Sequence, residues 1–390
     1  MADHVPFVNG PEDCRLFKNL YGDSAMVRLS LETLDNVIDR LPVGTQTWID
    51  PAIDGLQDLN PKTTTSQYMQ HVRRFTGHDR ISDPGFQTNP DENVVVDFVN
   101  DVMNACVGGP RKPHWVSIPQ LPAVGDSSRN KINRMLARAA GEWKTEQRSA
   151  VKLILPIIFT HQDQTKLKTK RKHPLSLSKK CYELAAADGV WVVEARLSDQ
   201  EGSKPLERRL AAIIDFHKEL AEVLPSGSLT IAGPYWGLNL ILWARNLVRY
   251  PAISLGSGYR YYVPGSPLHR ANQHFALSPL RRWATAGPPF KAWLKASLAR
   301  IPTQENAHRE FEALYKNYDA LVDDWRRQVA KFYKRWFDDL NAVPPNGRPL
   351  ALFQQLSSAY VLGRSLTELK SEGTARRPER VAQQLMMHCL

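Results

Sequence analysis

The chain has 390 residues, of which 42% are hydrophobic and 23% charged, a globular composition with enough length for one barrel and a further domain. Its longest apolar run, Leu153 to Phe159, falls far short of the roughly 20 residues of a membrane span, and residues 1–4 do not open a secretion signal. We therefore expect a cytoplasmic protein with no membrane partner, and the net charge of +11 favours polyanionic partners, above all nucleic acid.

Short apolar runs rich in β-branched residues predict the strands. In chain order they are Met26–Leu31, Thr47–Asp50, His114–Ile118, Val151–Phe159, Val190–Ala195, Leu229–Ala232, Ala252–Leu255 and an eighth candidate at Gln273–Leu277. Amphipathic helical segments at about 32–40, 91–107, 128–148, 175–187, 204–223 and 236–249 follow most of them. This alternation indicates parallel strands with helical crossovers, and seven or eight strands favour a closed barrel. The predicted fold is α/β, a (β/α)₈ TIM-like barrel with an appended C-terminal helical region.

The predicted barrel covers residues 1–287 and contains two insertions, at 51–113 and 160–174. Both insertions follow strands, so both belong to the catalytic face of a barrel. Residues 288–390 form a basic helical C-terminal region, in which an apolar stripe predicts one continuous helix over 305–340. No Gly-x-Gly-x-x-Gly fingerprint and no P-loop occurs.

An acid stands at the carboxyl end of the second predicted strand. Active sites of (β/α)₈ barrels lie where the strands end, so Asp50 is the first catalytic candidate, and Asp54, one turn further, is the second. A carboxylate there can act as a general base, a nucleophile or an electrostatic partner for a developing cation. The structural alternative is that Asp50 caps the turn opened by Pro51.

Glu194 lies at the carboxyl end of the fifth predicted strand, next to its last residue, and is the third catalytic candidate. An acid in an apolar strand is unfavourable unless it is paired or lies at a site. The alternative is an ion pair with Arg196, two residues further on the same face of the strand.

Several loops after strands carry side chains that fit a flat base. Tyr235 and Trp236, in the glycine-rich loop after the sixth strand, can stack on a flipped nucleobase, or else they pack under the helix that they begin. Gln120, after the third strand, can read a base edge through paired hydrogen bonds. Tyr259, after the seventh strand, completes the base-binding candidates.

Two loops carry cations for phosphate. Arg260 stands among tyrosines after the seventh strand, where barrels often bind phosphate, and it can clamp a phosphate bidentately; the alternative is a surface hairpin. The loop after the fourth strand has five basic residues in seven and no acid, namely Lys166, Lys168, Lys170, Arg171 and Lys172. Such a run fits a phosphate backbone, although a solvated loop has the same composition.

The sequence predicts no metal site and no cofactor. No His, Cys and Asp residues have metal-ligand spacing, and the four cysteines form no Cys-x-x-Cys pair. No Gly-x-Ser-x-Gly elbow occurs, so a serine hydrolase is not expected.

The loops together resemble the tRNA-guanine transglycosylase superfamily, a (β/α)₈ barrel that breaks a base–sugar bond in nucleic acid. The resemblance covers about residues 20–285 and rests on Asp50, on Gly233-Pro234-Tyr235-Trp236-Gly237 and on Leu255-Gly256-Ser257-Gly258. The superfamily's zinc-binding cysteine cluster is missing, and residues 251–290 contain no acid where the family has its nucleophilic aspartate. The resemblance therefore implies hydrolysis, with water as the acceptor, rather than covalent base exchange.

The predicted function is a DNA glycosylase-like enzyme that hydrolyses the N-glycosidic bond of a flipped, modified base, with Asp50 as the catalytic carboxylate. DNA is favoured over RNA, and defence against viruses that carry modified DNA is the suggested setting. Two alternatives stay open. One is a non-catalytic nucleic-acid-binding component of a larger system, and the other is a small-molecule barrel enzyme with Arg260 as the anchor of a phosphorylated sugar.

Overall fold

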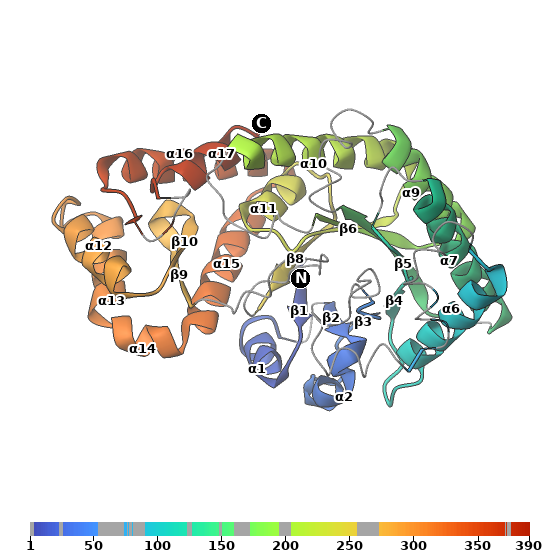
Figure 1. Cartoon of the computed structure of the whole chain (residues 1–390). Helices are drawn as coiled ribbons and strands as arrows, with labels where there is room; N and C mark the ends of the chain where they lie inside the picture. Colours follow the sequence, from blue (N-terminus) through green and yellow to red (C-terminus); the bar gives the residue numbers. More distant parts are fainter. Residues whose placement is uncertain are drawn as a thin grey trace.

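The computed structural model describes residues 4–22, 26–53, 74–75, 77, 80, 90–122, 127–147, 150–159, 172–194, 204–255, 273–370, 372 and 376–390. Eight parallel strands form a closed barrel in chain order (Figure 1). They are β1 (Val5–Val8), β2 (Val27–Ser30), β3 (Thr47–Asp50), β4 (Trp115–Ser117), β5 (Lys152–Phe159), β6 (Gly189–Glu194), β7 (Leu229–Ala232) and β8 (Tyr250–Ser254). The predicted α/β barrel is therefore confirmed.

One barrel strand differs from the prediction. The barrel closes through β1, which pairs with β2 on one side and with β8 on the other. The sequence analysis missed β1 because it is only four residues long and contains Pro6, which lacks a backbone donor. Gln273–Leu277 was wrongly predicted as a barrel strand, since β9 (His274–Leu277) pairs antiparallel with β10 (Arg282–Thr285) in a separate sheet.

Helices surround the barrel as the alternating pattern predicts (Figure 1). They are α1 (Pro11–Leu20), α2 (Leu34–Val37) between two 3₁₀ turns, α6 (Glu92–Val107), α7 (Ser127–Glu146), α9 (Lys172–Leu184), α10 (Lys204–Val223) and α11 (Gly237–Ala244). No helix in the described part of the chain is both long enough and apolar enough for a membrane span.

Side chains fill the interior of the barrel. Phe7, Trp48 and Trp191 meet edge to face at its centre, with ring centroids 5.2 to 5.7 Å apart. The indole of Trp48 donates to Ser117 Oγ at 2.7 Å and that of Trp191 to the carbonyl of Gly233 at 2.6 Å, so both buried N–H groups are satisfied. Residues next to these in each strand, such as Val8 and Val192, face the helices instead.

The C-terminal helices are α12 (Pro288–Leu298), α13 (Asn306–Lys316), α14 (Tyr318–Asp323), α15 (Trp325–Asn341), α16 (Arg348–Ser365) and α17 (Arg380–Met386). The continuous helix predicted over 305–340 is wrong, because the chain leaves helical geometry at Asn317 and Asp324. Side chains of Asn and Asp compete with backbone hydrogen bonds, and Asn317 bonds the carbonyl of Ala313 at 2.9 Å.

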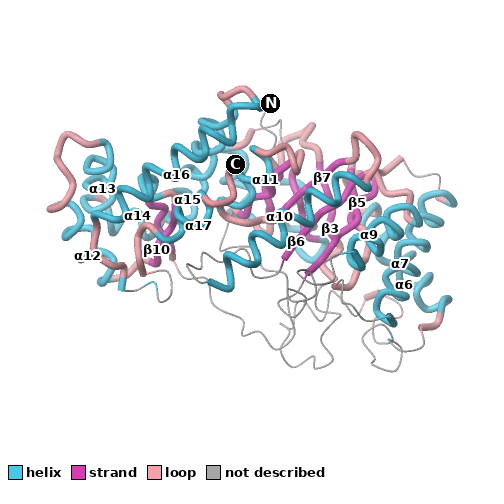
Figure 2. The backbone as a smooth tube through the Cα atoms, turned by 90° about the horizontal axis from the view of Figure 1, so that it is seen from above, coloured by secondary structure: helices cyan, strands magenta, loops and turns pink. Residues whose placement is uncertain are grey.

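The sheet of β9 and β10 shares a hydrophobic core with α12, α13 and α14. Side chains of α15, α16 and α17 instead join the core between the barrel and its helices. Figure 2 shows this order from above, with α15, α16 and α17 between the barrel strands and α12 to α14. The side chain of Gln328 in α15 bonds both N and O of Ala276, at 2.7 and 2.8 Å, which joins α15 to the edge of β9.

Candidate active site

Asp50 is the last residue of β3 and lies in register with Ser30, the last residue of β2. Trp48, two residues earlier, faces the barrel interior, so Asp50 lies on the same inward face of the strand. The first catalytic candidate therefore faces inward at the carboxyl end of the barrel, where active sites of this fold lie.

Arg28, from the middle of β2, holds the Asp50 carboxylate. Its Nε donates to Asp50 Oδ2 at 3.1 Å, and its Nη2 donates to the same oxygen. Both side chains are buried, at 2% and 9% exposed, and the guanidinium lies 4.9 Å from the centre of the Phe7 ring. Because both bonds end on Oδ2, Oδ1 takes no part in the ion pair.

The ion pair continues into a polar network toward α1. Arg28 Nη1 donates to Asn9 Oδ1 at 2.8 Å, and the backbone N–H of Asn9 donates to Asp13 Oδ2 at 2.9 Å. Burial raises the pKa of the Asp13 carboxyl. Asn9 directly follows β1 and is exposed, so the network reaches solvent at the strand ends.

Among the described residues at this end of the barrel, the interior has a polar side and an apolar side. Ser254, Asn9, Ser30 and Asp50 come from or directly follow the consecutive strands β8, β1, β2 and β3, on their inward faces. On the opposite side, Ile158 of β5 and Val193 of β6 belong to the apolar interior core. The strand ends thus offer hydrogen-bonding groups on one side and an apolar wall on the other.

Glu194 lies on the other face of its strand. Trp191 and Val193 face the barrel interior, so Glu194 faces the helices, where Arg209 Nη2 of α10 lies 3.4 Å from its Oε2. The structure therefore does not bring Glu194 together with Asp50, and burial of this acid is accompanied by an ion pair.

Tyr235 and Trp236 are both engaged in packing. The Tyr235 hydroxyl accepts from the Glu194 N–H at 2.8 Å and donates to the Val192 carbonyl at 3.2 Å, and burial raises its pKa. Trp236 stacks on Phe332 of α15 at 5.7 Å between centroids and donates to the Arg281 carbonyl at 2.9 Å. These contacts favour the structural alternative of packing: Tyr235 bonds the backbone of β6, and Trp236 joins the barrel to the C-terminal helices.

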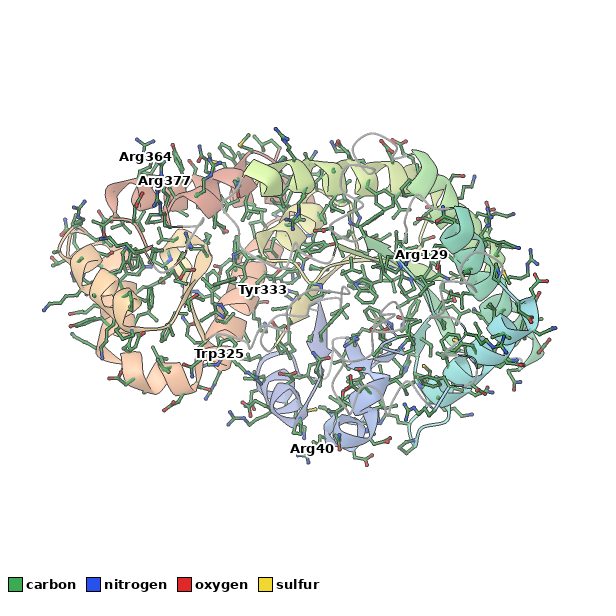
Figure 3. All side chains as sticks on the ribbon, viewed as in Figure 1. Arg40, Arg129, Trp325, Tyr333, Arg364 and Arg377 are labelled. Carbon is green, nitrogen blue, oxygen red and sulfur yellow. The ribbon has the colours of Figure 1, made fainter. Side chains whose placement is uncertain are left out.

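Figure 3 labels Tyr333 on α15, between the barrel and the outer C-terminal helices. Its ring meets that of Trp236 at 5.8 Å between centroids. The loop after β7 therefore contacts helix α15 from a distant part of the sequence.

Gln120 is buried and bonds the backbone of α7. Its Nε2 donates to the Asn133 carbonyl at 3.1 Å, while the Asn133 side chain bonds N and O of Leu121 at 2.8 and 3.0 Å. The side chain of Gln120 therefore bonds helix α7 and connects the loop after β4 to that helix.

The other predicted site residues lie outside the described side chains. Lys172 begins α9. The remaining candidates outside the described residues are Asp54, Tyr259, Arg260, Lys166, Lys168, Lys170 and Arg171. Their roles stay predictions.

Sequence reasoning missed Arg28 and Asn9. A signal for Arg28 was present, because a charged residue interrupts the apolar run Val27-Arg28-Leu29 at a position that alternation assigns to one face of a strand. Its partner is 22 positions away in the chain, on another strand, and no local pattern identifies it.

Within the described residues, no three His, Cys, Asp or Glu side chains are grouped so that they could hold a metal ion. The four cysteines are buried and free, and burial raises the pKa of each thiol. No protein-family model and no curated protein matches the chain.

Proposed function

We propose that the protein is an N-glycosidase that removes a flipped base from nucleic acid, DNA rather than RNA, with Asp50 as its catalytic carboxylate. The observation that carries this proposal is the position of Asp50 at the end of β3, facing inward, with Arg28 on Oδ2 and Oδ1 outside the ion pair. The remote resemblance to the tRNA-guanine transglycosylase superfamily adds a fold-level analogy for base–sugar chemistry.

In this reaction the bond between C1′ of the sugar and the base nitrogen breaks, and the base takes the electron pair and gains a proton. Water forms the new bond to C1′ and loses a proton. The sugar passes through an oxocarbenium-like transition state, which a nearby carboxylate stabilises. Asp50 supplies that negative charge, or accepts the proton of the water, while Arg28 holds its orientation through Oδ2.

The asymmetry of the strand ends supports the same substrate class. Hydroxyl and amide groups of Ser30, Asn9 and Ser254 fit the hydrogen-bonding groups of a sugar, and Ile158 and Val193 provide an apolar wall for a base. A modified base is favoured, because long segments of chain follow β3 and β5 and have the lengths of substrate-binding insertions. Defence against viruses with modified DNA is the biological setting that we propose.

The test is to incubate the purified protein with plain and modified DNA, single- and double-stranded, and to measure abasic sites. Asp50→Asn keeps the shape of the side chain and an acceptor for Arg28 but removes the charge. We expect this variant to bind DNA and to form abasic sites more slowly than the wild type by a factor of at least about 100. Absence of abasic sites on every substrate, or full activity in Asp50→Asn, would contradict the proposal.

Asp188→Asn is the matched control. Asp188 directly precedes β6, at the opposite end of the barrel, and its Oδ2 accepts from Lys144 Nζ at 2.9 Å and from the Leu153 N–H at 2.8 Å. It is another aspartate in an ion pair, but it lies away from the proposed site, so we expect this variant to keep its activity.

One observation favours a second candidate function, a non-catalytic nucleic-acid-binding component. A buried carboxylate with two bonds from an arginine is also typical of a purely structural ion pair. The variant Arg28→Met/Asp50→Leu replaces the pair by apolar side chains of similar length. If the pair is only structural, this variant keeps the biological activity, whereas a folded but inactive variant supports catalysis by Asp50.

A further inference from the structure

Three exposed cations occupy one side of helix α7. Lys131, Arg134 and Arg138 follow each other at helical spacings of three and four residues and so lie within about 60° of arc around the helix axis. Every other residue from 131 to 140, all of them described, is buried. We call these three cations the α7 stripe.

Acidic side chains leave much of this charge uncompensated. Residues 127–141 contain no Asp or Glu. Lys131 and Arg134 have no ion pair with any residue that the structure describes, and Arg138 has one exposed partner, Glu92, at 3.2 Å. Lysines on other helices have an acidic partner: Lys316 pairs with Glu312 of the same helix at 2.8 Å, and Lys291 of α12 pairs with Asp319 of α14 at 3.0 Å.

The stripe begins near the strand ends. Helix α7 follows β4, so its first turns lie at the carboxyl end of the barrel, as Figure 1 shows between α6 and α9. The Asn133 side chain bonds the backbone of Leu121, just beyond the end of β4 at Ser117. Lys131 precedes Asn133 in the helix, so the stripe runs from the strand ends along the outer wall.

We propose that the α7 stripe binds the phosphate backbone of the nucleic acid whose base enters the barrel, an inference that rests on the proposed function. Lys131 and Arg138 are separated by about 10 Å along the helix, which equals the rise of about three nucleotides of one strand along the axis of a duplex. The stripe belongs to a helix whose opposite side is buried, so the backbone positions of its three cations are fixed before the nucleic acid binds.

The same helix argues against an acidic membrane surface as the partner. A helix that lies on a membrane inserts exposed apolar side chains between the lipids. From 131 to 140 the exposed residues of α7 are all cations, and its apolar residues, among them Ile132, Met135 and Leu136, are buried in the core. Nucleic acid, which needs cations alone, is the better match.

The test compares DNA binding at a series of salt concentrations in the wild type and in Lys131→Gln/Arg134→Gln/Arg138→Gln. Glutamine keeps helix propensity, so the variant should fold with an unchanged thermal midpoint. Three lost phosphate contacts should reduce the slope of log K against log salt concentration by about 2 to 3 and weaken binding at least about tenfold. The DNA concentration that gives half-maximal abasic-site formation should rise in the variant.

Lys291→Gln/Lys295→Gln/Lys316→Gln is the control. It removes the same number of charges from α12 and α13, which pack in the separate C-terminal core, and we expect it to keep the wild-type salt slope. An equal loss of slope in this control would mean that net charge alone matters, and would overturn the inference.

Further outcomes separate the inference from the proposed function. If the wild type binds DNA and forms abasic sites but the α7 variant keeps the wild-type slope, the inference is wrong and the function stands. If DNA is bound through the stripe but no base is released, the inference stands and the N-glycosidase proposal fails. Loss of binding to phosphatidylserine-containing vesicles, with DNA binding unchanged, would assign the stripe to a membrane and overturn the inference.

Discussion

Arg28 and Asp50 form the only ion pair of described residues that lies inside the barrel, with both arginine bonds on one carboxylate oxygen. Arg28 lies in register with Trp48, so its guanidinium reaches from the aromatic centre of the barrel toward the last residue of the neighbouring strand. This relationship gives Asp50 one orientation and connects the interior core with the strand ends. Its energetic consequences can be measured separately from any activity.

Removal of Arg28 alone should destabilise the protein. Arg28→Met leaves the Asp50 carboxylate without its partner in a buried position, and such a change lowers the free energy of unfolding by about 3–5 kcal/mol. The double variant Arg28→Met/Asp50→Leu should lose much less, about 1–2 kcal/mol or nothing, because neither charge is left alone. Urea unfolding of Arg28→Met, Asp50→Leu and the double variant measures these free energies. A loss in the double variant that equals the sum of the two single losses would contradict the prediction.

The stability of the protein should fall as the pH drops below about 6.5. Burial lowers the pKa of His4 and of His217 from 6.5 to about 3, with Lys334 adding to the effect at His4. The unfolded chain therefore binds more protons between these values than the native protein does. The contribution of each neutral histidine is complete above pH 6.5 and is lost as the pH falls toward 3, by an amount on the order of a few kcal/mol.

His4→Phe tests this prediction at one of the two sites. The His4 ring lies among Tyr21, Tyr333 and Phe337, with 3.5 Å between its centroid and that of Phe337, and neither ring nitrogen has a hydrogen-bond partner among the described residues. A phenyl ring fits this surrounding and does not titrate. The free energy of unfolding of the variant should depend less steeply on pH between 3 and 6.5, and an unchanged slope would show that His4 does not titrate on unfolding.

Alanine substitutions at two glycines can distinguish the cost of backbone strain from the cost of steric contact. Gly233 and Gly227 have nearly the same positive φ, 86° and 88°. A Cβ at Gly233 would collide with the backbone N of Tyr235 and lie 2.5 Å from Asn239 Oδ1, whereas a Cβ at Gly227 would meet nothing within 4 Å. Gly227→Ala should therefore cost about 1 kcal/mol for the strained backbone, and Gly233→Ala clearly more.

The measurement is the free energy of unfolding of both alanine variants under the same conditions. Because the backbone penalty is shared, the difference between the two variants reports the contacts at Gly233. Equal losses would mean that the loop after β7 moves without cost, and that the contacts of Tyr235 and Trp236 are weaker than their distances suggest.

Local pattern was sufficient for much of the fold. The runs ending at Asp50, Phe159 and Glu194 are strands with nearly the predicted bounds, because an apolar β-branched run reports burial within a few residues. The same alternation makes Asp50 share a face with Trp48, so its inward position also follows from local order. Strand β1 was not predicted, because a run of four residues that contains a proline is too short to show a clear strand pattern.

Local sequence pattern did not predict which side chains contact each other at the site. Glu194 has the same position at a strand end as Asp50 but the opposite face, and its neighbour is Arg209 of α10. Tyr235 and Trp236 had the composition of a base-binding loop, yet Tyr235 bonds the backbone of β6 and Trp236 packs against α15, about a hundred residues later. Whether an aromatic loop after a strand is exposed or joins the core depends on whether a helix from a distant part of the chain covers it.

The sequence by itself determined the alternation of strands and helices, the acid at the end of β3 and the basic character of the chain, since each depends on neighbours along the chain. Only the tertiary structure decided that β1 closes the barrel, that Arg28 holds Asp50 and that α7 presents three cations to solvent. The physical reason is that these features depend on contacts between segments distant in the sequence. The free energy of such contacts is set by packing and charge pairing in the folded protein rather than by local preference.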